Sequence, residues 1–410
     1  MTGNHADTAD ADLVDSPYAW RRLAVSLALS TVGGIGLWSV VVTLPVIEQE
    51  FGIDRGGASL PYTATMIGFA VGGIVMGRLA DRFGIFVPLL VATCMLAVGY
   101  VAAAQAESLL TFMLAQSLLI GMMGSAATFG PLVADVSLWF EKRRGIAVGI
   151  VASGNYLSGT IWPPILSEAI QTVGWREAHI WIAVTCVVLM LPMAFYLRRR
   201  ADVTDKPNIL GRNGTIKPEG VSLRTIQIML IVAGLACCIA MSMPQVHIVA
   251  YCGDLGYGVA RGAEMLSVML GLGVVSRIIS GLIADKIGGL CTLLLGSTLQ
   301  CMALFFYIPY DGLVSLYVVS ALFGLSQGGI VPSYALIVRQ YFPAREAGAR
   351  VSLVLMTTVI GMAIGGWMSG EIYDYTGSYQ AAFINGIAWN LVNMSIAFFL
   401  LMNWRRTRTA

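Results

Sequence analysis

The chain has 410 residues, of which 57% are hydrophobic and only 12% are charged, with 46 glycines and a mean hydropathy of +0.76. This composition is too apolar for an ordinary soluble domain. The net charge of +2 is spread over loops rather than gathered in one patch, which gives no indication of nucleic-acid binding. We therefore predict an all-α integral membrane protein with the lipid bilayer, and no nucleic acid, as its partner.

Residues 1–19 are polar and acidic, the reverse of the basic start of a cleavable signal, so the first apolar segment should remain as a helix. Twelve hydrophobic segments follow, each long enough for the ~20 residues of a spanning helix. They lie near 23–47, 60–80, 86–106, 109–135, 145–170, 178–197, 224–252, 262–284, 289–309, 313–338, 347–370 and 380–402.

The longest loop without an apolar run, at about 198–223, divides these segments six and six. The predicted organisation is a tail at 1–22, an N-terminal six-helix bundle at 23–197, a linker at 198–223, a C-terminal six-helix bundle at 224–402 and a tail at 403–410.

Basic residues mark one side of the membrane. All but four of the 25 lysines and arginines lie at alternate loops and at the two tails, the four being Arg55, Arg176, Arg261 and Arg277. Because cytoplasmic loops collect lysine and arginine, we expect a multi-pass protein of the plasma (inner) membrane with both termini and the linker in the cytoplasm.

An internal repeat relates the two halves. Gly77–Gly84 (GRLADRFG) is echoed by Gly281–Gly288 (GLIADKIG), each at the end of the second helix of its half. Weaker echoes at nearly the same offset are Trp139-Phe140 with Tyr341-Phe342, and Gly174 with Gly377. Three echoes at similar offsets predict two related bundles.

Arg277 lies inside the apolar segment 262–284, eight residues and therefore roughly 12 Å before Asp285. A charge at that depth is costly and normally faces protein or a wet cavity. Gly273, Ser280 and Gly281 share its helical face, so we expect the guanidinium to point inward. A guanidinium can bind a carboxylate with two parallel hydrogen bonds, which makes an anionic substrate the simplest ligand.

An internal ion pair is the alternative role for Arg277. The acidic residues that could provide it lie near helix ends, namely Asp135, Glu168, Glu264, Glu371 and Asp374, so none clearly shares its depth.

The repeated loop resembles the signature of the major facilitator superfamily of secondary transporters, Gly-x-Leu-Ala-Asp-Arg-x-Gly between helices 2 and 3. The resemblance implies that Asp81, Arg82 and Asp285 take part in gating, with tight-loop packing as the alternative role. Within the superfamily, Arg277, the segment Val246–Gly256 and Gly174-Trp175-Arg176 are similar to the monocarboxylate transporter branch and its oxalate/formate antiporter relatives.

Two departures from that branch matter. Many animal monocarboxylate carriers place an aspartate where this chain has Gly273, and oxalate carriers add a lysine in helix 11 that 351–370 lacks. A site with a single cationic side chain favours a substrate with a single carboxylate. His247 is then a candidate proton site, or else makes a structural hydrogen bond.

The resemblance also places Trp38, Asn155, Gln327 and Tyr334 on helices that line the family's central cavity, as candidate substrate contacts. For the two aromatic side chains, packing or interfacial anchoring is the alternative.

An enzyme is not expected, because His5, His179 and His247 lack the spacing of metal ligands and no nucleophile-base motif occurs. A Walker loop is also missing from the sequence, so we expect no cofactor, no metal and no direct use of ATP. The favoured hypothesis is alternating-access transport of a small monocarboxylate coupled to protons. Exchange or export of other organic compounds, with a structural Arg277, is the alternative.

Overall fold

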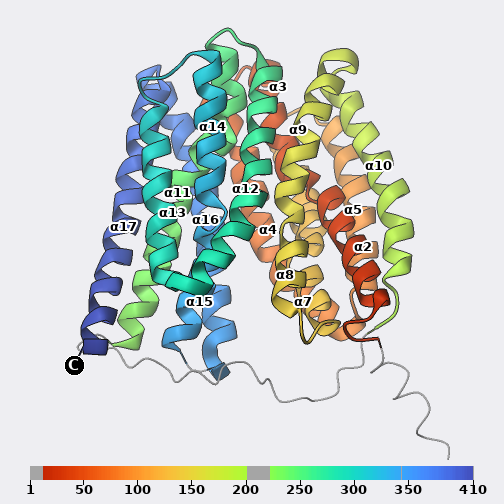
Figure 1. The fold of residues 1–410 in the computed structure, drawn as a ribbon. Coiled ribbons are helices and arrows are strands. Elements are labelled where there is room, and N and C mark those ends of the chain that lie inside the picture. The colour runs from red at the N-terminus through yellow and green to blue at the C-terminus, as the bar shows by residue number, and fades with distance from the viewer. Residues whose placement is uncertain (1–12, 201–221, 343, 410) are drawn as a thin grey trace, which may run out of the picture. The chain divides into compact units, whose positions relative to one another are not determined.

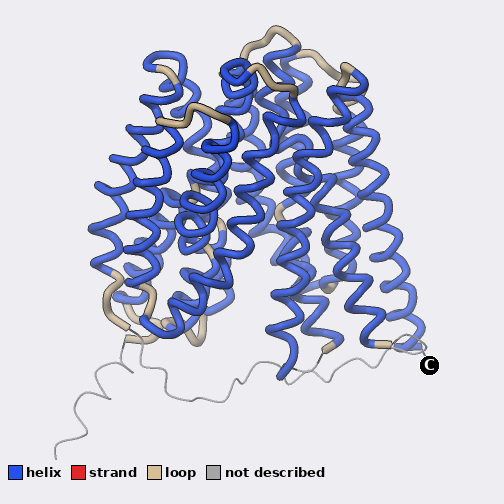
Figure 2. Tube along the Cα trace, turned by 180° about the vertical axis from the view of Figure 1, so that it is seen from behind, coloured by secondary structure: helices blue, strands red, loops and turns tan. Residues whose placement is uncertain are grey.

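The computed structural model describes residues 13–200, 222–342 and 344–409, and these are helical almost throughout, with no β-strand among them. The expected linker therefore falls largely outside the described residues. The helices form upright bundles whose connecting loops gather at the helix ends (Figures 1 and 2).

The elements of the first half of the chain are α2 (Pro17–Gly33), α3 (Ile35–Phe51), α4 (Arg55–Phe83), α5 (Phe86–Ala104), α6 (Leu109–Leu114), the π-helix η1 (Ala115–Gly124), the 3₁₀ turn η2 (Ser125–Thr128), α7 (Gly130–Leu138), α8 (Arg144–Ala152), α9 (Gly154–Val173) and α10 (Trp175–Tyr196).

Those of the second half are α11 (Leu223–Asp254), α12 (Val259–Ile287), α13 (Gly289–Phe306), α14 (Leu313–Gln327), α15 (Ile330–Tyr341), α16 (Ala344–Thr376) and α17 (Tyr379–Thr409).

Eleven helical stretches among the described residues are long and apolar enough to span a bilayer. The twelfth expected span, 145–170, is divided at Ser153 into α8 and α9, and α9 contains Pro163 and Pro164. The first and last helices extend beyond the expected spans, since α2 begins at Pro17 and α17 continues to Thr409. The all-α membrane architecture predicted from hydropathy is thus the observed one, and only helix ends and breaks differ.

The repeat seen in the sequence is also a repeat in backbone conformation. Gly84 and Gly288 both have positive φ, at 79° and 84°, and each donates its N–H to the carbonyl four residues earlier. Gly174 and Gly377 likewise share positive φ, at 84° and 65°. Glycine adopts this left-handed conformation without a steric penalty, so the repeated glycines end corresponding helices in the same way.

The chain groups into two compact units that cross the sequence halves. Of the described residues, one unit contains 13–43 and 64–200, and the other contains Leu44–Thr63 with those from 222 onward. The end of α3 and the beginning of α4 therefore belong to the unit built by the second half of the chain. We call 44–63 the crossing segment.

Glycines explain how α4 packs in both units. In its second half, Gly68 and Gly72 lie so close to η1 that a Cβ atom would meet the carbonyl oxygens of Ser117 and Met122 at 2.2 and 2.1 Å. In its first half, the neighbouring glycines belong to α16. Small residues spaced four apart let helix backbones approach in this way.

Candidate functional site

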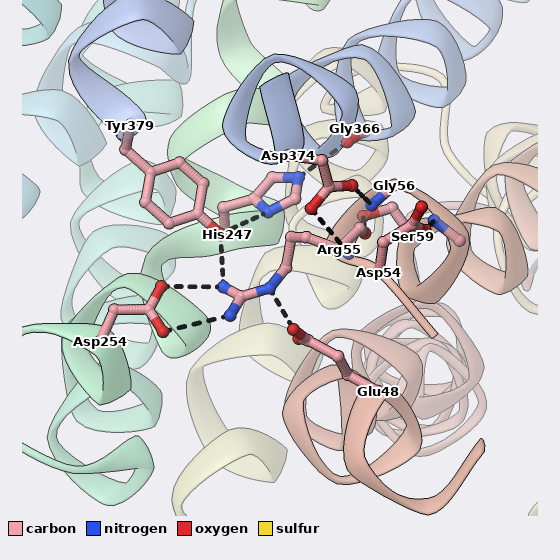
Figure 3. A network of polar contacts seen from close by, with 11 residues as sticks. Glu48, Asp54, Arg55, Gly56, Ser59, His247, Asp254, Gly366, Asp374 and Tyr379 are labelled. Atoms are coloured by element: carbon pink, nitrogen blue, oxygen red, sulfur yellow. Dashed lines mark hydrogen bonds and ion pairs between the residues drawn. The ribbon is translucent and has the colours of Figure 1, made fainter. Parts of the chain in front are cut away.

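The first turn of α4 carries a polar network that draws side chains from several helices of the second unit (Figure 3). Asp374 of α16 accepts hydrogen bonds from the backbone N–H groups of Arg55 and Gly56, at 3.0 and 2.6 Å. These are amides that a helix start leaves without an intrahelical partner, and a carboxylate there also interacts favourably with the helix dipole. Asp374 thus fixes where α4 begins.

The Arg55 side chain lies at the centre of this network, and the residue is only 6% exposed. Its Nη1 and Nη2 atoms donate to both carboxylate oxygens of Asp254, at 3.0 and 3.1 Å, and its Nε lies 2.6 Å from Oε2 of Glu48. Its Nη1 also donates to the Tyr379 hydroxyl at 2.7 Å. The planar fork of arginine suits such a set of convergent oxygen partners.

The Tyr379 hydroxyl connects Arg55 to His247. Nδ1 of His247 lies 3.0 Å from this hydroxyl, and Nε2 lies 2.7 Å from the Gly366 carbonyl oxygen. A carbonyl only accepts, so Nε2 carries a proton, and Arg55 only donates, so the tyrosine hydrogen is available for Nδ1. The pattern fits a neutral imidazole at a fully buried position.

Arg277 lies within α12, about 15 Å from the end of that helix at Ile287. It is half-buried. Its helix packs tightly against the junction of α14 and α15, because a Cβ at Gly328 would lie 2.5 Å from the Arg277 amide nitrogen. Ser276 reinforces this contact by donating to the Leu325 carbonyl at 2.6 Å.

Gln327 ends α14 directly before Gly328 and is fully buried. Its Oε1 accepts a hydrogen bond from Gln245 of α11, while its Nε2 has no hydrogen-bond partner within the described structure. A buried donor without a partner is costly unless another group reaches it. The structure therefore places Gln327, a predicted contact, directly before the glycine that packs against the Arg277 backbone, and it adds Gln245 as the hydrogen-bond partner of Gln327.

Tyr334 has a different environment. Its hydroxyl donates to Oδ1 of Asn393 at 2.8 Å, and Nδ2 of Asn393 donates to Ser297 at 2.7 Å. All three residues are buried among α13, α15 and α17. This satisfied cluster favours a packing role for Tyr334.

Trp38 and Asn155 lie together in the first unit. The indole nitrogen of Trp38 donates to the Asn155 backbone oxygen at 3.0 Å and approaches its side-chain oxygen at 3.3 Å. Trp38 is 4% exposed, and Asn155 is half-buried in α9. The two predicted contacts thus form one polar pair.

The repeated loop residues Asp81, Arg82 and Asp285 are exposed at the ends of α4 and α12. Arg200 donates to the backbone oxygens of Asp81 and Arg82, at 2.9 and 3.4 Å. Asp81 and Arg55 therefore lie toward opposite ends of the same helix.

Four of the five acids considered as partners for Arg277 bind other groups. Asp135 pairs with Arg22, Glu264 with Arg261 and Tyr317, Glu371 with Trp367, and Asp374 with the start of α4. Glu168 is exposed on α9.

Similarity to known proteins identifies the family. The family model described as Major Facilitator Superfamily matches residues 27–319. The chain belongs to the Major Facilitator Superfamily. Monocarboxylate transporter 13 of Bos taurus is 29% identical over 397 residues, covering 94% of this chain and 90% of that protein. The MFS-type transporter opdF of Penicillium oxalicum (strain 114-2 / CGMCC 5302) is 26% identical over 397 residues, covering 91% of each.

Among solved structures, a variant of the nucleoside transporter NupG superposes with a TM-score of 0.73 at 12% identity, covering 93% of this chain and 99% of that one. At this identity the likeness shows the fold alone. The superfamily membership predicted from the repeated loop is confirmed, and the protein is a transporter of this type rather than an enzyme.

The sequence reasoning missed the Arg55 network. Two features of the sequence could have pointed to it once the resemblance to the superfamily was recognised. Arg55 is one of only three basic residues in the loops predicted to lie on the non-cytoplasmic side. Asp254 lies inside the segment that resembles the monocarboxylate branch. Gln245 was missed because one glutamine in an apolar helix gives no sign of its partner.

Proposed function

We propose that this protein moves a small monocarboxylate across the membrane by alternating access, with Arg277 binding the substrate carboxylate. The observation that carries the proposal is the position of Arg277, well inside a membrane-spanning helix whose backbone packs against Gly328, the residue that follows the buried Gln327. An arginine at that depth is a functional residue by default, and an anionic ligand is its natural partner.

Gln327 supplies a second interaction in the proposed site. Its Nε2 donor can bind a substrate oxygen, and Gln245 holds the amide by donating to its oxygen. A ligand that offers only acceptors at one end, as a carboxylate does, would suit this donor together with the Arg277 guanidinium. Trp38 and Asn155 remain proposed substrate contacts.

Proton symport is the proposed coupling, with His247 as the proton site. Imidazole is the side chain that ordinarily titrates near neutral pH, and the nitrogen atom of His247 that can take a proton faces a hydroxyl rather than a carbonyl. We further propose that Asp81, Arg82 and Asp285 gate the cytoplasmic end of the path. The basic loops support cytoplasmic termini in a plasma membrane.

Uptake into proteoliposomes tests this proposal. Radiolabelled mono- and dicarboxylates are supplied with and without an inward proton gradient, to the native protein and to Arg277→Ala and Arg277→Lys. The matched control is Arg261→Ala, which removes an exposed arginine of the same helix that pairs with Glu264. We expect saturable monocarboxylate uptake, stimulated by the gradient, that Arg277→Ala abolishes and the control retains.

Two results would contradict the proposal. Uptake that is unchanged in Arg277→Ala would make the arginine structural. Broad competition by uncharged compounds would favour export or exchange of other organic molecules instead.

A further inference from the structure

The hydrogen bonds of the buried His247 ring have a fixed polarity. Nε2 donates to the Gly366 carbonyl, and Nδ1 accepts from the Tyr379 hydroxyl, whose oxygen accepts in turn from Arg55. A proton taken up at Nδ1 would make this nitrogen a donor. Tyr379 would then have to turn its own hydrogen away and accept from the ring as well as from Arg55. These hydrogen bonds therefore favour the neutral ring.

The charge of Arg55, in the crossing segment, acts in the same direction. Its Nη1 atom lies 2.7 Å from the Tyr379 hydroxyl oxygen, and that oxygen lies 3.0 Å from Nδ1 of His247. The two nitrogen atoms are therefore at most about 6 Å apart, a distance at which two positive charges repel strongly inside a protein. All of these residues belong to the second unit, so the interaction does not depend on how the two units are placed.

Carboxylates bind Arg55 on its other sides. Glu48 and Asp254 bind the side chain, and Asp374 binds the backbone N–H. Figure 3 shows the guanidinium between the first two carboxylates and the Tyr379 hydroxyl. Three carboxylates around one arginine leave this network with a surplus of negative charge. A buried positive charge is tolerated where opposite charges compensate it, so the network can accommodate one proton on the imidazole.

The remaining titratable side chains near the network, among the described residues, are tyrosines or acids and bases that bind other partners. They are Tyr62 of α4, Tyr251 of α11, Arg261 and Glu264 of α12, and Glu371 and Tyr373 of α16. Tyrosine is ordinarily neutral near pH 7. Arg261 and Glu264 pair with each other at the exposed surface, where charges are screened, and Glu371 binds Trp367. Arg55 and its carboxylates are thus the charges that act on His247.

We propose that Arg55 and Asp254 together set the pH at which His247 takes up a proton, with Arg55 opposing the protonated ring and Asp254 favouring it. The proton comes from water at the end of the helices where α4 begins and where the side chains of Glu48 and Asp254 are 23% and 31% exposed. It binds Nδ1, and the ring gains one positive charge. The inference rests on the proposed role of His247 as the proton site, and it assigns Arg55 and Asp254 as residues that act through the ring.

Histidine NMR measures this pH without any substrate. The chain has three histidines, so isotope-labelled histidine in the purified protein, reconstituted in lipid nanodiscs, gives a small set of ring signals. His5→Gln and His179→Gln identify the signals of the other two rings. The chemical shifts of the ring nitrogens, followed over a pH titration, give the midpoint for His247.

Two substitutions break the same ion pair but change its charge in opposite directions. Arg55→Gln removes the positive charge and should move the midpoint of His247 to higher pH by about one unit, a tenfold gain in proton affinity. Asp254→Asn removes a negative charge and should move it to lower pH by about half a unit. Loss of the ion pair as a structural contact would instead move both midpoints in the same direction.

Further variants keep the test decisive if one of these proteins does not fold. Arg55→Lys retains the charge and should leave the midpoint within about 0.3 units of the native value. Glu48→Gln removes another carboxylate bound to Arg55 and should act in the same direction as Asp254→Asn. The matched control is Arg261→Gln, which removes the arginine of an exposed pair and should not move the midpoint.

Shifts of the same sign in Arg55→Gln and Asp254→Asn would overturn the inference, and so would unchanged midpoints in both. A His247 ring that stays neutral in the native and Arg55→Gln proteins, down to the lowest pH at which they remain folded, would also overturn it. Uptake into proteoliposomes over the same pH range separates the two proposals. If the NMR midpoints move as expected while the pH dependence of uptake stays fixed, the electrostatic network stands and His247 is not the coupling site.

Discussion

Arg22 and Asp135 form a second buried ion pair, and we predict that breaking it lowers stability rather than transport. Nε and Nη2 of Arg22 donate to the two oxygens of Asp135, each at 3.0 Å, and Nη2 also donates to the Leu197 carbonyl at 3.2 Å. The two side chains are 1% and 10% exposed. Both residues belong to the first unit, so no step of alternating access needs to separate them.

Removing one partner leaves the other charge buried and uncompensated. The expected cost of Asp135→Ala is about 3–5 kcal/mol in the free energy of unfolding. A domain of about 150–250 residues loses roughly 2–4 °C in Tm for each kcal/mol of stability, so a loss of this size corresponds to roughly 6–20 °C. Replacing both partners, in Arg22→Met with Asp135→Ala, should cost at least about 2 kcal/mol less than Asp135→Ala alone, because no charge is left unpaired.

Thermal unfolding of the purified protein in detergent measures these values, and uptake per folded molecule measures function. Arg21→Met is the matched control, because Arg21 is the neighbouring exposed arginine, and its loss should change stability by no more than about 0.5 kcal/mol. The reasoning would be refuted if the free-energy cost of the double variant equalled the sum of the costs of its two single substitutions. It would also be refuted by a single variant that keeps its Tm but loses transport.

Two further predictions concern the proposed site and its coupling. Tyr379→Phe removes the hydroxyl shared by Arg55 and His247, and a hydrogen bond to a charged group contributes about 1.5–3 kcal/mol. We expect the response of uptake to an imposed proton gradient to fall by at least about tenfold, measured against uptake without a gradient, and an unchanged response would remove His247 from the coupling. Gly328→Ala forces a methyl group against the Arg277 backbone, which should cost about 1–3 kcal/mol and weaken substrate binding, as measured by Tm and by substrate-dependent stabilisation. Gly281→Ala is its control, and equal behaviour of the two variants would contradict the close packing.

The membrane architecture could be predicted from the sequence because the bilayer imposes a local rule. A span needs about 20 apolar residues wherever it lies in the chain, so hydropathy located the helices without knowledge of their neighbours. The repeated Gly84 and Gly288 could be interpreted for the same reason, since a left-handed helix end depends on one residue's own backbone. The depth of Arg277 also followed from counting along one helix.

Which helices touch, and which way their polar residues face, became visible only in the folded chain. Helices surrounded by lipid and protein are apolar on every side, so periodicity does not show whether Tyr334 faces a cavity or, as observed, Asn393. Arg55 and Asp254 are 199 positions apart, and no local signal connects them. Their contact exists because Gly366 and Gly370 let α4 approach α16, a fit between backbones that are distant in the sequence and meet only on folding.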